Sequence, residues 1–401
     1  MFLNFFSWSR APKVEAKTSL ASPDDFLSEI FAATPSASGV SVTPAKAMTC
    51  PPVRCAVQAI AEAIGQLPIH VYRRTNGGKD RAPDHPTYRL LHDEANDHTS
   101  ATDFREQLTR DALLHGNGLA LINRVDGKII ELIRLDPAAV DIEADDLGSP
   151  RYFLRQETQR REIASADVLH IKAPSLNGIT GDSPIRQARE TIGLLLAIEA
   201  HAARLFKNGA RPSGQIVLPK KAAPDTRKNL IAAWRLAHGG ENSGGTALLD
   251  DGAEYKPVAL TSVEAQLIEV WNRAVLDVAR VFRVPPALLM DYSRQTWANA
   301  ELGGQQFLTY TLSRWIKAWE GEVRLKLFGV DERDTFLAEF LIDDLLRSDI
   351  SARADAYAKL IAARVLNPNE ARAMENRAPY EGGDVFANPN TTSNTPGNPD
   401  V

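Results

Sequence analysis

The feature that most constrains the fold is a pair of long amphipathic segments joined by a proline-containing loop, between Thr261 and Phe328. In the first segment, apolar residues recur at helical spacing and charged residues occupy the opposite face. The apolar face comprises Leu267, Trp271, Ala274, Val278 and Phe282, and the charged face comprises Glu269, Arg273, Asp277 and Arg280. Thr261 and Glu264 have the spacing of a capping box. Pro285 and Pro286 end the helix, because proline cannot continue the hydrogen-bond ladder.

The loop from Val284 to Asn299 is followed by a second apolar stripe that lasts until Gly329. This stripe comprises Leu308, Leu312, Trp315, Trp319 and Val323. Tryptophans at this spacing could stack on nucleic-acid bases, but a stripe at helical spacing is more typical of a core. Two long helices folded back over a loop of mixed polarity are more typical of a device that positions the loop than of an enzyme pocket.

Composition limits the partners of the 401-residue chain. A net charge of −5 disfavours tight binding of nucleic acid, since phosphate affinity comes mainly from Lys and Arg. It does not exclude a protein through which DNA passes. Cys50 and Cys55 give no disulfide framework, which indicates a reducing cytoplasm, and we expect both to be buried as small apolar residues. The apolar start MFLNFFSW is too short to span a membrane and predicts an arm that docks, for example, on a neighbouring subunit.

The first part of the chain predicts an arm followed by an α+β domain. Residues 1–45 are rich in Ala, Ser, Pro and Lys and are expected to form a poorly ordered arm with one short helix near 25–33. Residues 46–180 predict helices and strands of an antiparallel sheet. The expected elements are helices Pro52–Ile64 and Ala101–Leu114, the latter capped by Thr102, and strands Pro68–Arg74, Tyr152–Arg155 and Val168–Ile171. A hairpin is expected around Asp126-Gly127, within Gly118–Asp136.

The second part begins with a long helix over 181–208. Ser183 is its N-cap, Pro184 takes the first helical position, and Asn208-Gly209 ends it. The segments that follow are a small β-α-β insertion (209–260), a helix (261–283), the loop (284–299), a helix and strand (300–345), a helical pair (346–380) and a disordered tail (381–401). Asn367 and Glu370 mark the start of the last helix.

No segment predicts catalytic chemistry or a cofactor site. His85, His92 and His98 alternate with acidic residues, but their spacing matches no zinc pattern and favours surface or loop-capping roles. The glycine-rich 238–245 lacks the Gly-Lys-Ser/Thr ending of a phosphate-binding loop. Gly181-Asp182-Ser183 lacks the second glycine of a nucleophile elbow and predicts the N-cap instead. A metal-dependent hydrolase or nuclease that uses the three histidines stays as an alternative function.

Seven segments of the chain resemble, in the same order, segments of a known protein family. They are CPPVRCAVQAIAEAIGQLPIHVYRR; DHPTYRLL with FREQLTRDALLHGNGLALI; LHIKAPSLNGITGDSPI; FKNGARPSGQIVLP; LLDDGAEYKPV; VFRVPPALLMDYSRQTWANAE; and LLRSDISARADAYAKLIAARVLNPNEARAMENRAPYEGGD. From about Pro51 to Asp384, the chain resembles the portal proteins of HK97-type tailed phages and gene transfer agents. It departs from the family pattern at Ala95-Asn96-Asp97 and at Ser313-Arg314.

The resemblance implies a non-enzymatic, structural protein of the virion. Such proteins form a dodecameric ring at one capsid vertex, assembled in the cytoplasm of the host bacterium. The ring is the conduit for double-stranded DNA, which the large terminase subunit packages and which leaves on ejection. The implied partners are terminase, a head-tail adaptor protein and the major capsid protein, with no membrane and no cofactor. An adaptor ring of a contractile apparatus is a further alternative.

By the same resemblance, the α+β region (46–180, with 300–345) would be the wing. The helices 181–208 and 261–283 would be the stem, 209–260 the clip, 284–299 the tunnel loop and 346–380 the crown. The DNA-facing residues would be Asp291, Tyr292, Ser293, Arg294, Gln295 and Thr296. The residues that contact terminase or adaptor would be Arg211, Lys220, Lys221, Arg227 and Lys228 of the clip. A nearly neutral loop suits weak contact with sliding DNA, because every phosphate contact must be broken again.

Overall fold

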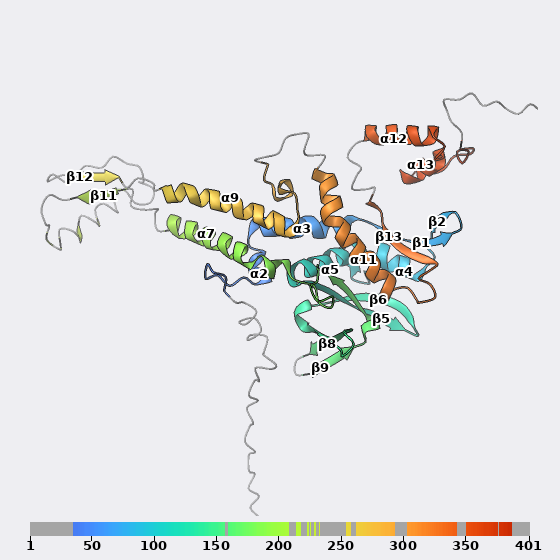
Figure 1. Cartoon of the computed structure of the whole chain (residues 1–401), viewed down its shortest axis with the longest axis horizontal. Helices are drawn as coiled ribbons and strands as arrows, with labels where there is room; N and C mark the ends of the chain where they lie inside the picture. The colour runs from blue at the N-terminus through green and yellow to red at the C-terminus, as the bar shows by residue number, and fades with distance from the viewer. Residues whose placement is uncertain are drawn as a thin grey trace, which may run out of the picture.

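The computed structural model shows a mixed α+β protein in which a body carries a projecting arm of two helices (Figure 1). The residues it describes are 35–156, 159–207, 214–217, 223, 225, 228–229, 232, 254–257, 262–292, 303–342, 350–375 and 377–386. Expectations for 1–34, the end of the tail (387–401) and most of the 209–260 insertion therefore lie outside the described residues.

Two helices that pack on each other form the centre of the body: α3 (Pro51–Gln66) and α5 (Ala101–His115). The expected N-cap Thr102 is wrong, because α5 begins at Ala101, as expected, and Thr102 lies inside its first turn. Ser100 Oγ accepts the hydrogen bond from the Asp103 amide at 3.0 Å and is the cap. Both helices present apolar faces to one continuous core. Cys50 precedes α3 and is buried, and burial raises the pKa of its thiol to about 12.

Every strand pair that the structure describes is antiparallel, and the strands form several small sheets. One sheet orders β13 (Phe336–Phe340), β1 (Ile69–Thr75) and β2 (Gly78–Arg81), and a second orders β10 (Val168–Lys172), β5 (Asn117–Val125) and β6 (Lys128–Leu135). A third comprises β7 (Val140–Ala144), β8 (Pro150–Gln156) and β9 (Gln159–Ile163), and β3 (Glu94–Asn96) pairs with β4 (Thr99–Ser100). The predicted hairpin is confirmed, with positive φ at Asp126 and Gly127 in its two-residue turn.

The second predicted amphipathic helix consists of a π-helical stretch, η5 (Phe307–Leu312), that continues into α11 (Ser313–Lys326). Its apolar stripe is confirmed as core: Trp315, Trp319 and Val323 are buried. Trp319 Nε1 donates to Thr109 Oγ1 on α5 at 3.1 Å, which joins this helix to the centre of the body.

The arm is built from α7 (Arg189–Lys207) and α9 (Ser262–Phe282), which run antiparallel and pack on each other (Figure 1). The predicted single helix from Ser183 is in two pieces, because α6 (Pro184–Gln187) ends at Ala188, whose backbone leaves the helical region. A two-stranded sheet of β11 (Gly214–Val217) and β12 (Glu254–Pro257) lies at the far end of the arm.

Shorter elements complete the described chain. They are α2 (Pro44–Ala47), α4 (Pro86–His92), η1 (Pro137–Ala139), η2 (Ser165–Asp167), η4 (Pro286–Leu289), α12 (Ile350–Ala362) and α13 (Pro368–Met374). The predicted start of α13 is confirmed, with a complete capping box between Asn367 and Glu370. None of the helices among the described residues is long and apolar enough to cross a membrane.

Candidate functional site

The arm is fixed to the body at one end only. The body end of α7 buries Ile192, Leu195 and Leu196, and the body end of α9 buries Ala274, Val278, Ala279 and Phe282. These residues belong to the main core, so the root of the arm cannot move without disturbing it. Away from the root, Ile268 and Val270 of α9 are 65% and 40% exposed. The outer part of the arm therefore carries apolar side chains that nothing in the described chain covers.

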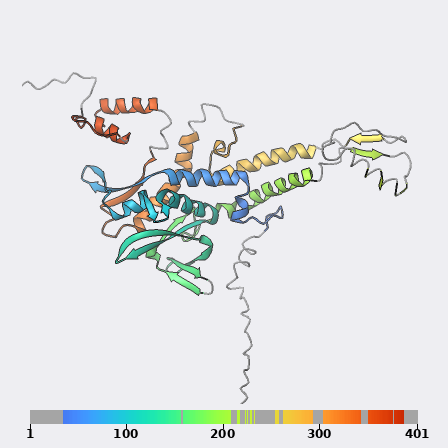
Figure 2. The same ribbon diagram turned by 180° about the vertical axis from the view of Figure 1, so that it is seen from behind.

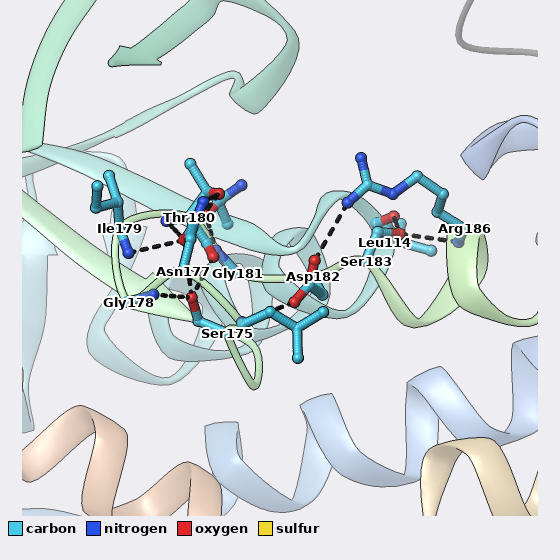
Figure 3. Close-up of polar contacts among 12 residues, drawn as sticks. Leu114, Ser175, Asn177, Gly178, Ile179, Thr180, Gly181, Asp182, Ser183 and Arg186 are labelled. Atoms are coloured by element: carbon cyan, nitrogen blue, oxygen red, sulfur yellow. Dashed lines mark hydrogen bonds and ion pairs between the residues drawn. The ribbon is translucent and has the colours of Figure 1, made fainter. Parts of the chain in front are cut away.

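A loop of residues 173–183 joins strand β10 to the root of the arm, and we call it the junction loop (Figure 3). Asn177 organises its tip. The side-chain oxygen of Asn177 accepts hydrogen bonds from the amides of Ile179 and Thr180, both at 2.9 Å. A short polar side chain that satisfies nearby amides in this way replaces regular secondary structure, so the loop has a defined shape.

Side chains on both limbs of the junction loop hold it closed (Figure 3). Asp182 accepts from the Leu176 amide at 2.9 Å and pairs with Arg186 of α6 at 3.3 Å. Ser183 accepts from the Arg186 amide at 3.2 Å and donates to the carbonyl of Leu114 at 2.6 Å. The predicted N-cap role of Ser183 is confirmed, and its hydroxyl also ties α6 to the end of α5.

Two glycines bring the junction loop against the body. Gly116 ends α5 with a φ of +91°, and the Ala173 amide donates to its carbonyl at 2.9 Å. A Cβ on Gly181 would lie 2.0 Å from the Gly116 oxygen, so only glycine fits there. Sequence reasoning missed this contact, because the two glycines are far apart in the chain and no periodicity connects them.

A buried histidine connects the same loop to the sheet and to α11. His170 Nε2 donates to Asn117 Oδ1 at 2.9 Å, and Tyr152 donates its hydroxyl proton to Nδ1 at 3.0 Å. Asn117 Oδ1 also accepts from the Gly181 amide at 2.8 Å, which fixes it as an acceptor and sets the histidine tautomer. The His170 amide donates to Glu322 at 3.1 Å. Burial lowers the pKa of His170 to about 3 and keeps the ring neutral.

Residues 35–43, which fall within the expected N-terminal arm, pack as a strap on the root of α7. Ser36 is buried against Gly193, and the Ala37 amide donates to Glu190 Oε2 at 2.7 Å. Val40 and Val42 reach the main core. The strap therefore ties residues 35–43 to the body at the root of α7.

The expected DNA-facing loop is described only at its start. Arg283 and Met290 have positive φ values of 57° and 62°, and η4 lies between them. The Thr311 hydroxyl donates to the carbonyl of Arg283, which ties the loop to η5. Asp291 is half-buried and Tyr292 is 60% exposed, with its hydroxyl 3.4 Å from the sulfur of Met290. Ser293, Arg294, Gln295 and Thr296 lie outside the described residues.

The expected clip contacts are represented by one residue. Lys228 is helical and exposed, whereas Arg211, Lys220, Lys221 and Arg227 lie outside the described residues. What the structure does describe at the end of the arm is a small antiparallel sheet, in which β11 and β12 pair from Gly214↔Pro257 to Val217↔Glu254.

The three histidines of the alternative metal site have separate local roles. His85 caps α4, with its Nδ1 accepting from the Thr87 amide at 3.2 Å, and His92 stacks on Tyr88. The His98 amide donates to Asn96 Oδ1 at 3.0 Å. Within the described ranges, no group of three His, Cys, Asp or Glu side chains could hold a metal ion.

Comparisons with known proteins identify the class of protein in which a body fixes the root of a projecting two-helix arm. The phage portal protein family matches residues 51–376. The probable portal protein of Streptomyces phage phiC31 is 28% identical over 368 residues, covering 86% of this chain and 79% of the relative. The portal protein of Enterobacteria phage HK97 is 28% identical over 344 residues, covering 83% and 79%.

Solved structures share the fold. A chain of the virion of a native gene transfer agent particle gives a TM-score of 0.61 at 23% identity, covering 89% of this chain and 95% of that chain. A chain of the neck of a native gene transfer agent particle, computed with C12 symmetry, gives 0.59 at 22% identity, covering 88% and 100%.

The chain belongs to the phage portal protein family. The family is structural and not enzymatic, so the expectation of a portal protein of the virion without catalytic activity is confirmed.

Proposed function

We propose that this portal protein assembles into a closed ring at one capsid vertex and that double-stranded DNA passes through the ring. The arm carries the proposal, because its root is locked into the core while Ile268 and Val270 lie in solvent near its outer end. Neighbouring apolar residues outside the packed face of a long helix suit a contact with another chain. A closed cyclic ring needs one heterologous interface, repeated at every copy.

In this assignment α7 and α9 are the stem, the α+β body is the wing, and α12 and α13 belong to the crown. The C12 symmetry of the structurally similar neck of a gene transfer agent particle supports a dodecamer. The region around β11 and β12 is the clip, whose Lys228 and neighbouring basic residues meet terminase during packaging and the head-tail adaptor afterwards. The wing contacts the major capsid protein.

The loop from Val284 to Asn299 is the tunnel loop in this proposal, and it faces the DNA. Its start is held rigidly by η4 and by the bond from Thr311 to Arg283, while Tyr292 projects into solvent. Asp291 and Arg294 nearly cancel in charge, so the loop guides DNA by shape and repetition without holding it.

The test is the assembly state of the purified full-length chain, measured by native mass spectrometry and electron microscopy. Rings with a central channel are expected, and Ile268→Asp should prevent them because it places a charge in the contact between arms. Leu147→Asp is the matched control, because Leu147 is 92% exposed in a turn of the body. A strictly monomeric wild-type chain at micromolar concentration, also with partner proteins present, would contradict the ring.

A further inference from the structure

The C-terminal helical unit, residues 350–386, has a defined shape but almost no core. In both views α12 and α13 lie apart from the helices and sheets of the body (Figures 1 and 2). The main core includes residues up to Phe340 and none from this unit. Among the α12 residues whose burial is described, from Ala354 to Ala362, none is buried.

The defined shape comes from polar contacts around one asparagine. The Asn369 side chain donates to the carbonyl of Tyr380 at 2.9 Å and to Asp384 at 3.0 Å, and its oxygen accepts from the Tyr380 amide at 3.0 Å. A Cβ on Gly383 would lie 2.3 Å from that oxygen, so the turn closes tightly on the asparagine. The hydroxyl of Tyr357 donates to Glu375 at 3.0 Å and links α12 to α13.

These contacts cannot stabilise the unit by themselves. Among its residues whose burial is described (354–375 and 377–386), the buried ones are Asn367, Asn369, Ala371 and Gly383, and of these Ala371 alone contributes an apolar side chain. A helix as short as α12 is marginal in water unless an apolar face is packed. Folded units of fewer than about 40 residues usually need a disulfide, a metal or a partner chain. The described part of this unit contains neither cysteine nor a metal-binding group, which leaves a partner chain.

The apolar surface of the unit is extensive. Its exposed large apolar residues are Leu360, Val365, Met374, Tyr380, Val385 and Phe386. Within α12, Ala354, Ala356, Ala358 and Ala362 lie on either side of a single charged strip formed by Asp355 and Lys359, and so broad an apolar surface is normally packed against a neighbour.

The charge of the unit decides between the candidate partners. Residues 350–386 contain five basic and five acidic side chains, so their formal charge is zero. DNA is therefore a poor partner, because its affinity comes from an excess of basic residues. Mixed charges around an apolar surface instead suit a second copy of the same unit, in which acidic and basic groups of neighbours can pair.

We propose that residues 350–386 dock against the same residues of the adjacent copy, so that this unit becomes stably folded only when the ring closes. The inference rests on the proposed ring. In a cyclic assembly each copy has one neighbour on either side, so α12 would be covered on two faces without a further partner protein.

Hydrogen exchange of the full-length chain, read by mass spectrometry in separated monomer and ring fractions, tests this proposal. Amides of α12 should exchange at least tenfold more slowly in rings than in monomers, while those of α3 and α5 should be protected in both. Rings whose α12 amides exchange as in the monomer would overturn this inference and leave the ring intact. A chain that forms no ring would overturn the proposed function, and this inference with it.

A double variant, Leu360→Asp with Val365→Asp, separates the surface from a general effect on folding. It should abolish the protection of α12 in rings and leave the exchange of the body unchanged. Leu147→Asp, the control in the body, should leave the protection of α12 intact. Protection of α12 that follows the addition of DNA to monomers, rather than ring formation, would show that DNA covers the unit and would overturn the proposal.

Discussion

At the scale of single residues, the root of the arm depends on positions where backbones touch. Gly181 lies against the backbone of Gly116, and the Gly181 amide also donates to Asn117. Atoms of the main chain cannot rotate away as the end of a side chain can. The junction loop therefore tolerates no added atom at this point, and its geometry determines how α6 and α7 leave the body.

Gly181→Ala is expected to lower the free energy of unfolding by about 1–3 kcal/mol, the usual cost of overpacking. The new methyl would lie 2.0 Å from the Gly116 oxygen and 2.7 Å from the Ala173 nitrogen. Gly77→Ala is the control, because a Cβ there would meet nothing within 4 Å. Chemical denaturation measures both variants, and equal free energies of unfolding would refute the argument.

His170 predicts a dependence of stability on pH. Burial lowers the pKa of its imidazole from the ordinary 6.5 to about 3. Between pH 3 and pH 6.5 the unfolded chain binds a proton at His170 that the folded chain does not bind. The contribution of His170 to the free energy of unfolding is therefore complete above pH 6.5. It is lost progressively as the pH falls toward 3.

The measurement is the melting temperature of wild type and His170→Gln between pH 7 and pH 5. Wild type should lose stability on acidification more steeply than the variant, whatever the absolute stability of the variant. The pKa of the neighbouring Glu322 is raised by burial, which acts with the opposite sign and is retained in both proteins. A slope for His170→Gln that is parallel to that of wild type would exclude His170 as the cause.

At the scale of elements, the strap of residues 35–43 and helix α7 fit together through a second glycine. A Cβ on Gly193 would lie 2.1 Å from Ser36 Oγ and 2.6 Å from its Cβ, so Gly193→Ala should release the strap from the helix. Faster proteolysis or hydrogen exchange at residues 35–40 is the expected result. Gly321→Ala in α11 is the helical control with no atom nearby, and it should stabilise the protein by about 0.5–1 kcal/mol. An undisturbed strap in Gly193→Ala would show that Ser36 is not held by this contact.

Elements defined by local patterns were predictable from the sequence. The Asp126-Gly127 hairpin, the capping box of α13 and the apolar stripes of α9 and α11 each follow from residues close together in the chain. The expected cap residue Thr261 and the centre of the loop lie outside the described residues, so those expectations stay predictions. The strands β7 and β9 were missed. The sequence of β9, QRREI, is almost entirely polar, and among the described strands β9 pairs with β8 alone.

Features defined by contact across the fold were not predictable. The π-helical turns before α11, the break at Ala188 and the Gly116–Gly181 approach depend on neighbours that are distant in sequence. The network of His170, Tyr152 and Asn117 is of the same kind, since a lone histidine in an apolar strand gives no local signal. Of the candidate site residues, only Asp291, Tyr292 and Lys228 are described, and their roles stay predictions.

At the scale of the whole molecule, a conduit that does not bind its cargo tightly should be sensitive to added positive charge. In the proposed ring, Tyr292→Lys adds one positive charge per copy at the start of the tunnel loop. Each phosphate that such a ring holds must be released again as DNA advances, so DNA packaging should slow several-fold at low salt. The rate should recover as salt rises, because binding to phosphates weakens steeply with salt concentration.

Tyr292→Phe is the matched control, because it keeps the aromatic side chain and removes only the hydroxyl, which lies 3.4 Å from the sulfur of Met290. Tyr292→Glu keeps the change in size but reverses the charge, and it should not slow packaging in a salt-dependent way. The packaging rate is measured with terminase and ATP at several salt concentrations, after electron microscopy shows that each variant forms rings. If Tyr292→Lys packages at the wild-type rate at every salt concentration, the loop does not face the DNA and its neutrality has no function. If the variants fail to form rings, the loop is required for the architecture of the ring, and its proposed role in guiding DNA is wrong.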